Sequence, residues 1–127
     1  MARTVPETRT AGLRVLLVED EMMIAMAMED MLAELGHRVG GPVARLAKAM
    51  EAARREAFDV AILDVNLNGQ DVYPVAEALA GRGIPFVFTT GYTKSRLRPP
   101  YGDRPTLQKP FRMQDLRTAL AAVNRRD

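Results

Sequence analysis

Five short segments with the character of strands divide this chain, and segments with the apolar spacing of helices separate most of them. The expected strands lie at 13–18, 38–43, 58–63, 84–90 and 106–108. The first is a continuous apolar run apart from Arg14, as is typical of a strand buried on both faces, whereas two glycines and a proline weaken the second. Strands that alternate with helices form parallel β-α-β units, so the pattern predicts an α/β protein with a doubly wound sheet.

The segments between the expected strands carry apolar residues three or four positions apart, as the buried face of a helix requires. We expect helices around 24–35, 46–57, 72–79 and 113–123. Gly36 and Gly81 would end two of them. Asp71 is expected to cap the third helix, with Pro74 in its first turn. In the first helix, Met28 and Met31 fall on the apolar face, which favours core packing over a methionine-rich binding surface.

Length and composition narrow the class of protein. The chain has 127 residues, one domain by the usual length prior, and no cysteine, which excludes a disulfide framework and thiol chemistry. It has neither an apolar run of the ~20 residues that a membrane helix needs nor a secretory signal, and this favours the cytoplasm. The net charge of +2, with basic residues mostly spread out, argues against a nucleic-acid binder. We expect a polar tail at 1–12, one domain at 13–124 and a C-terminal end at 125–127.

Polar side chains gather where the expected strands end. The first strand is followed by Glu19 and Asp20, the third by Asp64 and the fifth by Lys109, and the fourth ends in Thr90. Ligands of doubly wound sheets bind beyond the carboxyl ends of the strands, so these side chains are expected to converge on one rim.

Carboxylates that converge repel one another, and a hard divalent cation removes that repulsion. Magnesium prefers oxygen ligands and usually takes one or two protein carboxylates. Asp20 and Asp64 could bind it directly, and Glu19 could act through a water. The backbone carbonyl of Asn66 could supply a further ligand. The sequence therefore predicts a magnesium site at the rim.

The same set of side chains suits phosphoryl transfer to a carboxylate. Asp64 could be the nucleophile, giving an aspartyl phosphate, and Lys109 could stabilise the negative charge of the transition state. A threonine hydroxyl could then bond a phosphoryl oxygen. Neighbouring strand residues face opposite sides, so only one of Thr89 and Thr90 can do this. Gly91 would let a phosphate approach closely, which favours Thr90.

Four motifs stand at these strand ends: Val18-Glu19-Asp20-Glu21, Leu63-Asp64-Val65-Asn66, Thr90-Gly91 and Lys109-Pro110-Phe111. This ordered set resembles the signature of response-regulator receiver domains of two-component systems, over about residues 13–124. The resemblance implies a flavodoxin-like sheet of five parallel strands in the order 2-1-3-4-5, with about five helices. Matched residue by residue, it implies Asp64 as phosphoacceptor, Glu19 and Asp20 as the acidic pair, Thr90 as switch hydroxyl and Lys109 as the lysine. It also implies a cis Lys109–Pro110 bond, an uncommon feature in folded proteins.

Two features depart from the usual family pattern. The segment between Thr90 and Lys109 has only 18 residues, several of them proline, so the fourth helix is expected to be short or irregular. Thr106 stands where the family often has an aromatic residue, and Tyr92 is the candidate to replace it. Phe88-Thr89-Thr90-Gly91 resembles a receiver subfamily with a Phe-x-Thr-Gly segment, commonly paired with atypical histidine kinases of α-proteobacteria.

The resemblance implies a single-domain response regulator that is not an enzyme, apart from autodephosphorylation. Its phosphoryl group would come from a histidine kinase or a histidine phosphotransfer protein, and its changed surface would act on a downstream protein partner. We expect no direct nucleic-acid or membrane contact, and a monomer or weak homodimer.

Three alternatives remain open at this stage. The first is a phosphate sink or relay. The second is a phosphatase-like enzyme, which usually carries its nucleophile in an Asp-x-Asp motif after the first strand, whereas Asp64 follows the third. The third is a degenerate receiver that only binds partners, against which the intact set of site residues argues.

Overall fold

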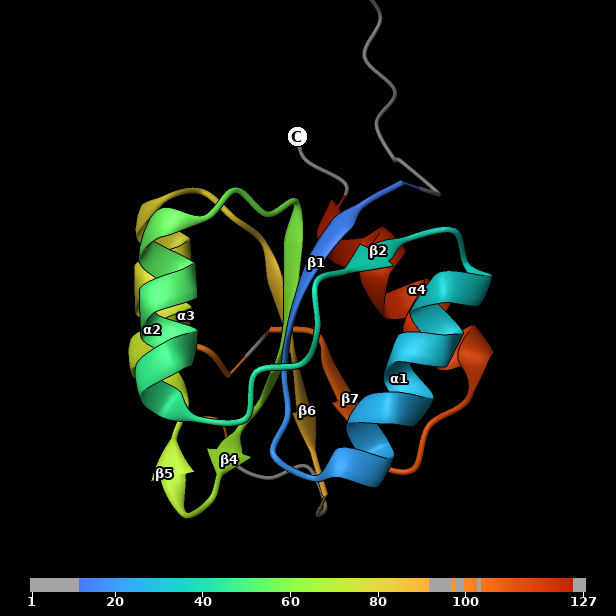
Figure 1. The fold of residues 1–127 in the computed structure, drawn as a ribbon, viewed down its shortest axis with the longest axis horizontal. Helices are drawn as coiled ribbons and strands as arrows, with labels where there is room; N and C mark the ends of the chain where they lie inside the picture. The colour runs from blue at the N-terminus through green and yellow to red at the C-terminus, as the bar shows by residue number, and fades with distance from the viewer. Residues whose placement is uncertain (1–11, 92–96, 98–99, 103, 125–127) are drawn as a thin grey trace, which may run out of the picture.

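The computed structural model describes residues 12–91, 97, 100–102 and 104–124. Within them, parallel strands form a 5-stranded sheet in the order β2-β1-β3-β6-β7, flanked by helices on both faces (Figure 1). The expected order 2-1-3-4-5 is confirmed, because β6 and β7 are the fourth and fifth strands of this sheet. The elements are β1 (Arg14–Val18), α1 (Met22–Glu34), β2 (Arg38–Val39), α2 (Leu46–Arg55), β3 (Val60–Asp64), β4 (Asn66–Leu67), β5 (Gln70–Asp71), α3 (Tyr73–Gly81), β6 (Phe86–Thr90), β7 (Thr106–Gln108) and α4 (Met113–Asn124).

The sheet separates two apolar clusters, because successive strand residues point to opposite faces. Leu16, Leu63 and Phe88 face α2 and α3, which lie on the left of Figure 1. Leu17 and Val87 face α1 and α4 on the right. The central strand β3 is buried at every position, as expected for a strand covered on both faces. No helix in the described part of the chain is long and apolar enough to cross a membrane.

Several element bounds differ from the sequence expectations. The second strand ends at Val39 rather than Val43, since the chain leaves the sheet at Gly40 and Gly41, the latter with φ 122°, and rejoins it through a bridge from Val43 to Val18. The second helix ends at Arg55, two residues earlier than expected. The expected irregular fourth helix, like Tyr92, falls in a segment that lies mostly outside the described residues.

The segment that follows β3 forms a β-hairpin. β4 and β5 pair antiparallel, with Leu67 opposite Gln70. The two residues between them, Asn68 and Gly69, have φ values of 55° and 82°, as a two-residue type I′ turn requires. The predicted Asp71 cap is wrong: Asp71 belongs to β5, and the N-cap of α3 is Val72, without a side-chain capping bond. Pro74 does lie in the first turn.

The methionines of α1 divide between core and surface. Met28 is fully buried and Met31 packs against the same cluster, which confirms the core role expected for these two. Met22, Met23 and Met26 are 70%, 81% and 55% exposed. They therefore present an apolar surface along the outside of this helix.

Tyr101, which lies between β6 and β7 in the sequence, packs against α3 and β6. Its ring stacks on that of Tyr73 at 5.6 Å and meets the rings of Phe86 and Phe88 edge-on at 5.9 and 5.6 Å. Only 8% of Tyr101 is exposed. The aromatic cluster thus makes Tyr101 part of the core.

Replacing Tyr101 with alanine is expected to lower the free energy of unfolding by about 3 kcal/mol, because it leaves a cavity and removes the ring contacts. Tyr101→Phe, the matched control, keeps the ring and should change it by less than about 1 kcal/mol. Urea unfolding of both variants measures the difference. Equal stabilities for the two variants would show that the ring contributes nothing.

Candidate functional site

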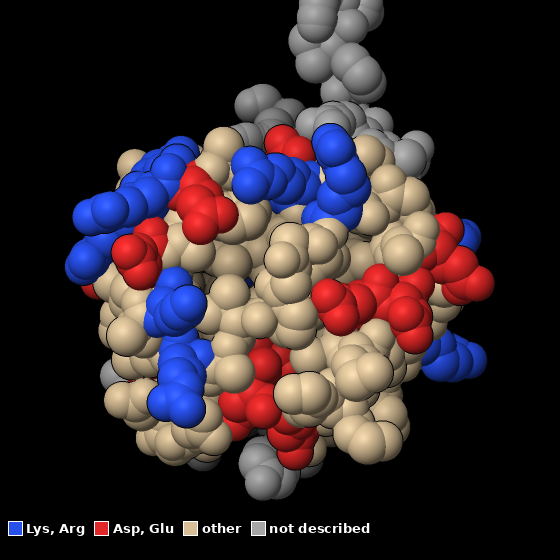
Figure 2. Space-filling view, viewed as in Figure 1, with Lys and Arg blue, Asp and Glu red and all other residues tan. Residues whose placement is uncertain are grey.

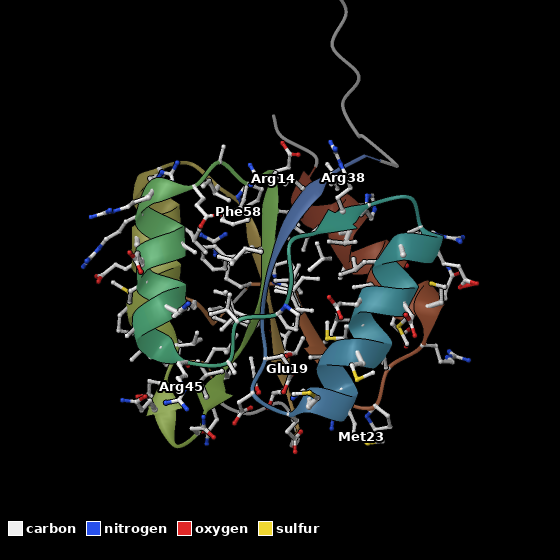
Figure 3. The ribbon with its side chains drawn as sticks, in the orientation of Figure 1. Arg14, Glu19, Met23, Arg38, Arg45 and Phe58 are labelled. Carbon is white, nitrogen blue, oxygen red and sulfur yellow. The ribbon has the colours of Figure 1, made fainter. Side chains whose placement is uncertain are left out.

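Four of the predicted site side chains meet at the carboxyl edge of the sheet. Glu19 and Asp20 follow β1, Asp64 ends β3 and Lys109 follows β7. This edge is the lower one in Figure 1, and Figure 3 places Glu19 there. In Figure 2 acidic side chains gather at the same edge of the molecule. The expected convergence is therefore confirmed for these residues.

Three carboxylates form the centre of the site. Glu19, Asp20 and Asp64 each offer an oxygen, and these oxygens lie within 4.8 Å of one another. Glu19 and Asp64 are almost fully buried, at 2% and 5% exposure, while Asp20 is half-buried. Buried carboxylates this close repel each other strongly unless cations or hydrogen-bond donors compensate.

Backbone amides hold each carboxylate in place. The N–H of Glu21 donates to Glu19 Oε2 at 3.0 Å, and that of Asn66 donates to Asp64 Oδ1 at 3.2 Å. The N–H of Asn68, at the tip of the β4–β5 hairpin, donates to Asp20 Oδ2 at 2.9 Å. Sequence reasoning missed this role of the hairpin, although the Asn68-Gly69 pair is a turn signal.

Lys109 supplies the positive charge of the site. Its Nζ lies 2.9 Å from Glu19 Oε1, 3.3 Å from Asp64 Oδ2 and 3.9 Å from Glu21 Oε1. The Lys109 N–H donates to the Thr90 carbonyl at 2.8 Å, which fixes the start of the side chain at the end of β6. The Lys109–Pro110 peptide bond is cis, as the family resemblance implied.

Thr90 and Thr89 differ in burial. Thr90 ends β6 and is half-buried, whereas Thr89 is only 1% exposed and pairs in register with Asp64. Asn66 begins β4, where its amide side chain accepts the Gly69 N–H at 2.7 Å. These residues border the carboxylates without adding a charge.

Burial and charge shift the pKa values of two groups. Burial, followed by the negative charge of Glu19, raises the pKa of Asp64 to about 7, although Lys109 and the Asn66 N–H oppose the shift. For Lys109, burial alone would lower the pKa, but bonds and attraction to Glu19 and Asp64 outweigh it and raise the pKa above its ordinary value. The carboxylates thus carry more negative charge than one ammonium relieves.

The metal-free protein is expected to lose stability as the pH rises through the range set by Asp64. In the folded state the pKa of Asp64 is about 7, whereas its ordinary value is 3.8. Between these values the folded state binds more protons than the unfolded chain, so the free energy of unfolding falls with pH. Urea unfolding in EDTA across this window measures the slope. Asp64→Asn should flatten it, and a rise in stability across the window would contradict the assignment.

The donor set fits magnesium. All the candidate ligands are carboxylate or carbonyl oxygens, which hard divalent cations prefer, and the cluster has an excess of negative charge for a cation to neutralise. Asp20, the most exposed of the three carboxylates, lies on the solvent side, where a partly hydrated ion could enter.

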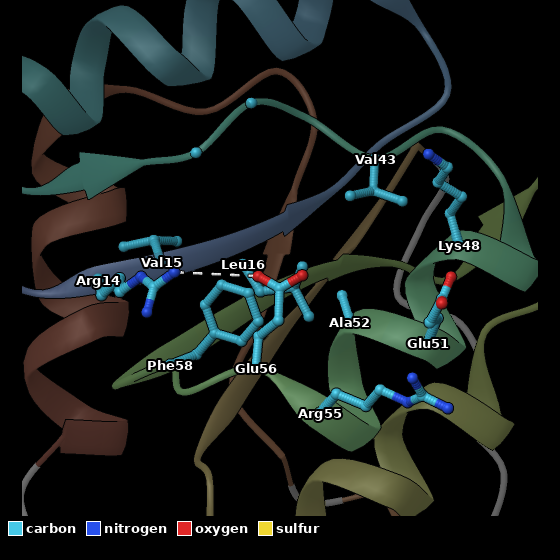
Figure 4. Close-up of a pocket in the computed structure, with 12 residues that line it drawn as sticks. Arg14, Val15, Leu16, Val43, Lys48, Glu51, Ala52, Arg55, Glu56 and Phe58 are labelled. Carbon is cyan, nitrogen blue, oxygen red and sulfur yellow. Dashed lines mark ion pairs between the residues drawn. The ribbon is translucent and has the colours of Figure 1, made fainter.

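A separate groove of about 490 Å³ lies between β1, the 40–43 segment and α2 (Figure 4). Arg14 and Glu56 form an ion pair across 3.9 Å in its lining, and the Arg14 guanidinium lies 5.4 Å from the centre of the Phe58 ring. Basic and acidic side chains alternate there, so their charges offset each other rather than converge on one ligand. None of the predicted site residues lines this groove.

Comparison with known proteins supports the assignment made from the site. The chain matches the family described as the response regulator receiver domain over residues 15–121. It is 33% identical over 117 residues to the transcriptional regulatory protein PdtaR of Mycobacterium tuberculosis, covering 88% of this chain and 57% of that protein. The chain thus spans little more than half the length of this curated relative.

Solved structures that resemble this chain support the same family. The solution structure of SdrG from Sphingomonas melonis Fr1 has a TM-score of 0.81 and 46% identity, covering 91% of this chain and 98% of that one. The receiver domain of the sensor histidine kinase PA1611 from Pseudomonas aeruginosa PAO1 has a TM-score of 0.72 and 26% identity, covering 90% and 98%. That structure is described with a magnesium ion coordinated in its active-site cleft. Given the fold, the acidic edge and the family match over most of its length, this chain belongs to the response regulator receiver domains of two-component systems.

Proposed function

We propose that this domain accepts a phosphoryl group on Asp64 in a magnesium-dependent reaction and signals through a changed surface. The observation that carries the proposal is the position of Asp64. It ends the central strand β3, and its carboxylate lies within reach of two further carboxylates and the Lys109 ammonium. Such a group can act as nucleophile only if the negative charges around it are neutralised.

Asp20 and Asp64 are proposed to bind the metal directly, with Glu19 acting through a water and the Asn66 carbonyl as a further ligand. When bound, magnesium would neutralise the carboxylates and bind phosphate oxygens. The backbone bonds from Glu21, Asn66 and Asn68 each use one oxygen of a carboxylate, and the ion would share the second oxygens of Glu19 and Asp64 with Lys109. The backbone hydrogen bonds would thus hold the carboxylates in position before the ion binds.

In the transfer step, an Asp64 oxygen forms a bond to phosphorus while the bond from phosphorus to the donor nitrogen breaks. The donor histidine keeps the electron pair of that bond as its leaving group and takes up a proton. Lys109 stabilises the charge on the phosphoryl oxygens, and Thr90 donates a hydrogen bond to one of them after transfer. Hydrolysis of the acyl phosphate would return the carboxylate, so autodephosphorylation is the expected reset.

The proposed donor is a sensor histidine kinase or a histidine phosphotransfer protein, and the proposed output is a downstream protein partner. A mostly apolar groove of about 450 Å³ beside Lys109 supports a docking site for the donor close to Asp64. Met23, Ile24 and Met31 of α1 form one wall, and Pro110 and Phe111 form the other. The exposed methionines of α1 extend this surface. We place the domain in the cytoplasm, and propose a monomer or weak homodimer without direct nucleic-acid contact.

The test is an NMR titration of the backbone amides, first with magnesium and then with magnesium plus beryllofluoride, which imitates a phosphoryl group on Asp64. We expect shifts centred on Asp20, Asp64, Thr90 and Lys109 that spread to residues 92–105. Shifts confined to the site would instead favour a phosphate sink or relay. No shift with either addition would contradict the proposed chemistry.

A further inference from the structure

Thr89 carries a buried hydroxyl with no hydrogen-bond partner in the part of the chain that the structure describes. The residue is 1% exposed. An unpartnered hydroxyl destabilises a folded protein, because the group gives up its bond to water and gains nothing in return. Valine has the same shape without this penalty, so valine at this position would give a more stable protein if only packing mattered.

Strand register places Thr89 beside Asp64. β3 and β6 align Asp64 with Thr89, and β6 and β7 align Thr89 with Leu107. Val87, two residues earlier on β6, packs with the cluster under α1 and α4, to which Ile62 and Leu107 also belong. Alternation along the strand therefore turns Asp64 and Thr89 to this same side of the sheet.

The side chain of Lys109 crosses β6 to reach Asp64. It starts after β7, and its Nζ lies 3.3 Å from Asp64 on β3 and 2.9 Å from Glu19 beyond β1. β6 lies between β7 and β3 in the sheet, and neighbouring strands are ~4.8 Å apart. The strands β7 and β3 are therefore ~10 Å apart, and the side chains of Lys109 and Asp64 together bridge this gap over the end of β6, on the side where Thr89 lies next to Asp64.

We propose that Thr89 is a positioning residue for Lys109, and that its hydroxyl accepts a hydrogen bond from the ammonium once Asp64 is occupied. This inference rests on the proposed function of Asp64. In the structure the carboxylates of Glu19 and Asp64 bind the ammonium, so the hydroxyl is left over. When these carboxylates turn to a metal ion, the ammonium loses acceptors. A phosphoryl oxygen replaces one of them, and an ammonium with three N–H donors still needs another. The Thr89 hydroxyl is a side-chain acceptor on β6, the strand over which the Lys109 side chain passes.

Two variants separate the hydroxyl from the shape of the side chain. Thr89→Val keeps the shape and removes the hydroxyl, whereas Thr89→Ser keeps the hydroxyl and removes a methyl group. The measurements are the melting temperature in EDTA, the rate of phosphoryl labelling by acetyl phosphate with magnesium, and the apparent Kd for beryllofluoride by NMR. The first reports on the resting fold alone, and the other two report on the occupied site.

The variants are expected to rank in opposite orders. Thr89→Val should melt about 3–6 °C higher than the wild type, because it removes an unpartnered polar group. It should nevertheless be labelled, and bind beryllofluoride, about tenfold less well, a change equivalent to about 1.4 kcal/mol. Thr89→Ser should melt lower than the wild type, because it leaves a cavity, yet react and bind close to wild-type levels.

Three results would overturn the role of Thr89 without touching Asp64: wild-type labelling of Thr89→Val, a lower melting temperature for Thr89→Val, or equal losses of labelling in both variants. The first result would mean that the hydroxyl does not contribute to labelling. The second result would mean that the hydroxyl is already hydrogen-bonded in the resting state. The third result would mean that only the shape of the side chain matters. A wild-type protein that neither binds beryllofluoride nor becomes labelled would overturn the function of Asp64, and the role of Thr89 with it.

Discussion

Replacing Asp64 with asparagine is expected to abolish phosphoryl labelling of this domain. Asparagine has nearly the same shape, and its amide oxygen can still accept the Asn66 N–H that now bonds Asp64 Oδ1 at 3.2 Å. It lacks the anionic oxygen that would attack phosphorus. Labelling should therefore fall by at least about 10³-fold, the scale seen when a catalytic nucleophile is removed. Intact mass spectrometry after incubation with acetyl phosphate and magnesium measures the phosphorylated fraction.

The matched control is Asp30→Asn, which makes the same chemical change at an exposed position of α1. It should be labelled at the wild-type rate. Loss of labelling in Asp64→Asn must also not come from unfolding, and we expect this variant to be at least as stable as the wild type in EDTA at neutral pH. The reason is that the neutral amide removes the repulsion from Glu19. A phosphorylated Asp64→Asn protein would show that another residue is the acceptor.

The site could be predicted from the sequence because parallel strands bring distant residues to one edge. Glu19, Asp64 and Lys109 are far apart along the chain, yet each directly follows an expected strand. When these strands lie parallel in one sheet, their carboxyl ends share an edge, and the charged side chains that follow them converge there. The contacts from Lys109 to Glu19 and Asp64, at 2.9 and 3.3 Å, are a consequence of that topology.

Local details escaped prediction where backbone geometry, rather than residue type, decides them. The segment 38–43 was expected to form a strand weakened by its glycines and proline, and the consecutive glycines let the chain leave the sheet after Val39. Asp71 has the side chain of a helix cap, yet the hairpin places it in β5 one residue before the N-cap. His37 follows a glycine, as a solvated turn residue would, but it is only 8% exposed and its Nδ1 accepts the Leu13 N–H at 3.2 Å.

The hairpin of β4 and β5 also shows why the acidic cluster could not be built from side chains alone. The Asn68 N–H, 48 residues from Asp20 in sequence, donates to the Asp20 carboxylate. The residue type does not show that a backbone amide binds a carboxylate, since every non-proline residue has such an amide. The residue types do show the turn that orients this amide, because the Asn68-Gly69 pair favours positive φ values. Turn chemistry is thus part of the description of this site.

Replacing Lys109 with methionine is expected to destabilise the metal-free protein by about 3 kcal/mol, because it leaves buried carboxylates without their cation. Glu19 and Asp64 have side chains only 1% and 7% exposed, so water cannot take over from the ammonium. Labelling should fall by about 10²-fold or more, since the ammonium proposed to stabilise the phosphoryl oxygens is gone. Urea unfolding in EDTA and labelling by acetyl phosphate measure the two effects.

Two further variants decide whether charge is the cause. Lys48→Met, the same substitution at an exposed position of α2, should change stability by less than about 0.5 kcal/mol. Introducing Lys109→Met into the Asp64→Asn protein should cost less than introducing it into the wild type, because one of the stranded carboxylates is already neutral. Magnesium should likewise restore part of the stability lost in Lys109→Met. If the loss were the same in both backgrounds and magnesium had no effect, the positive charge of Lys109 would not be the cause of the destabilisation.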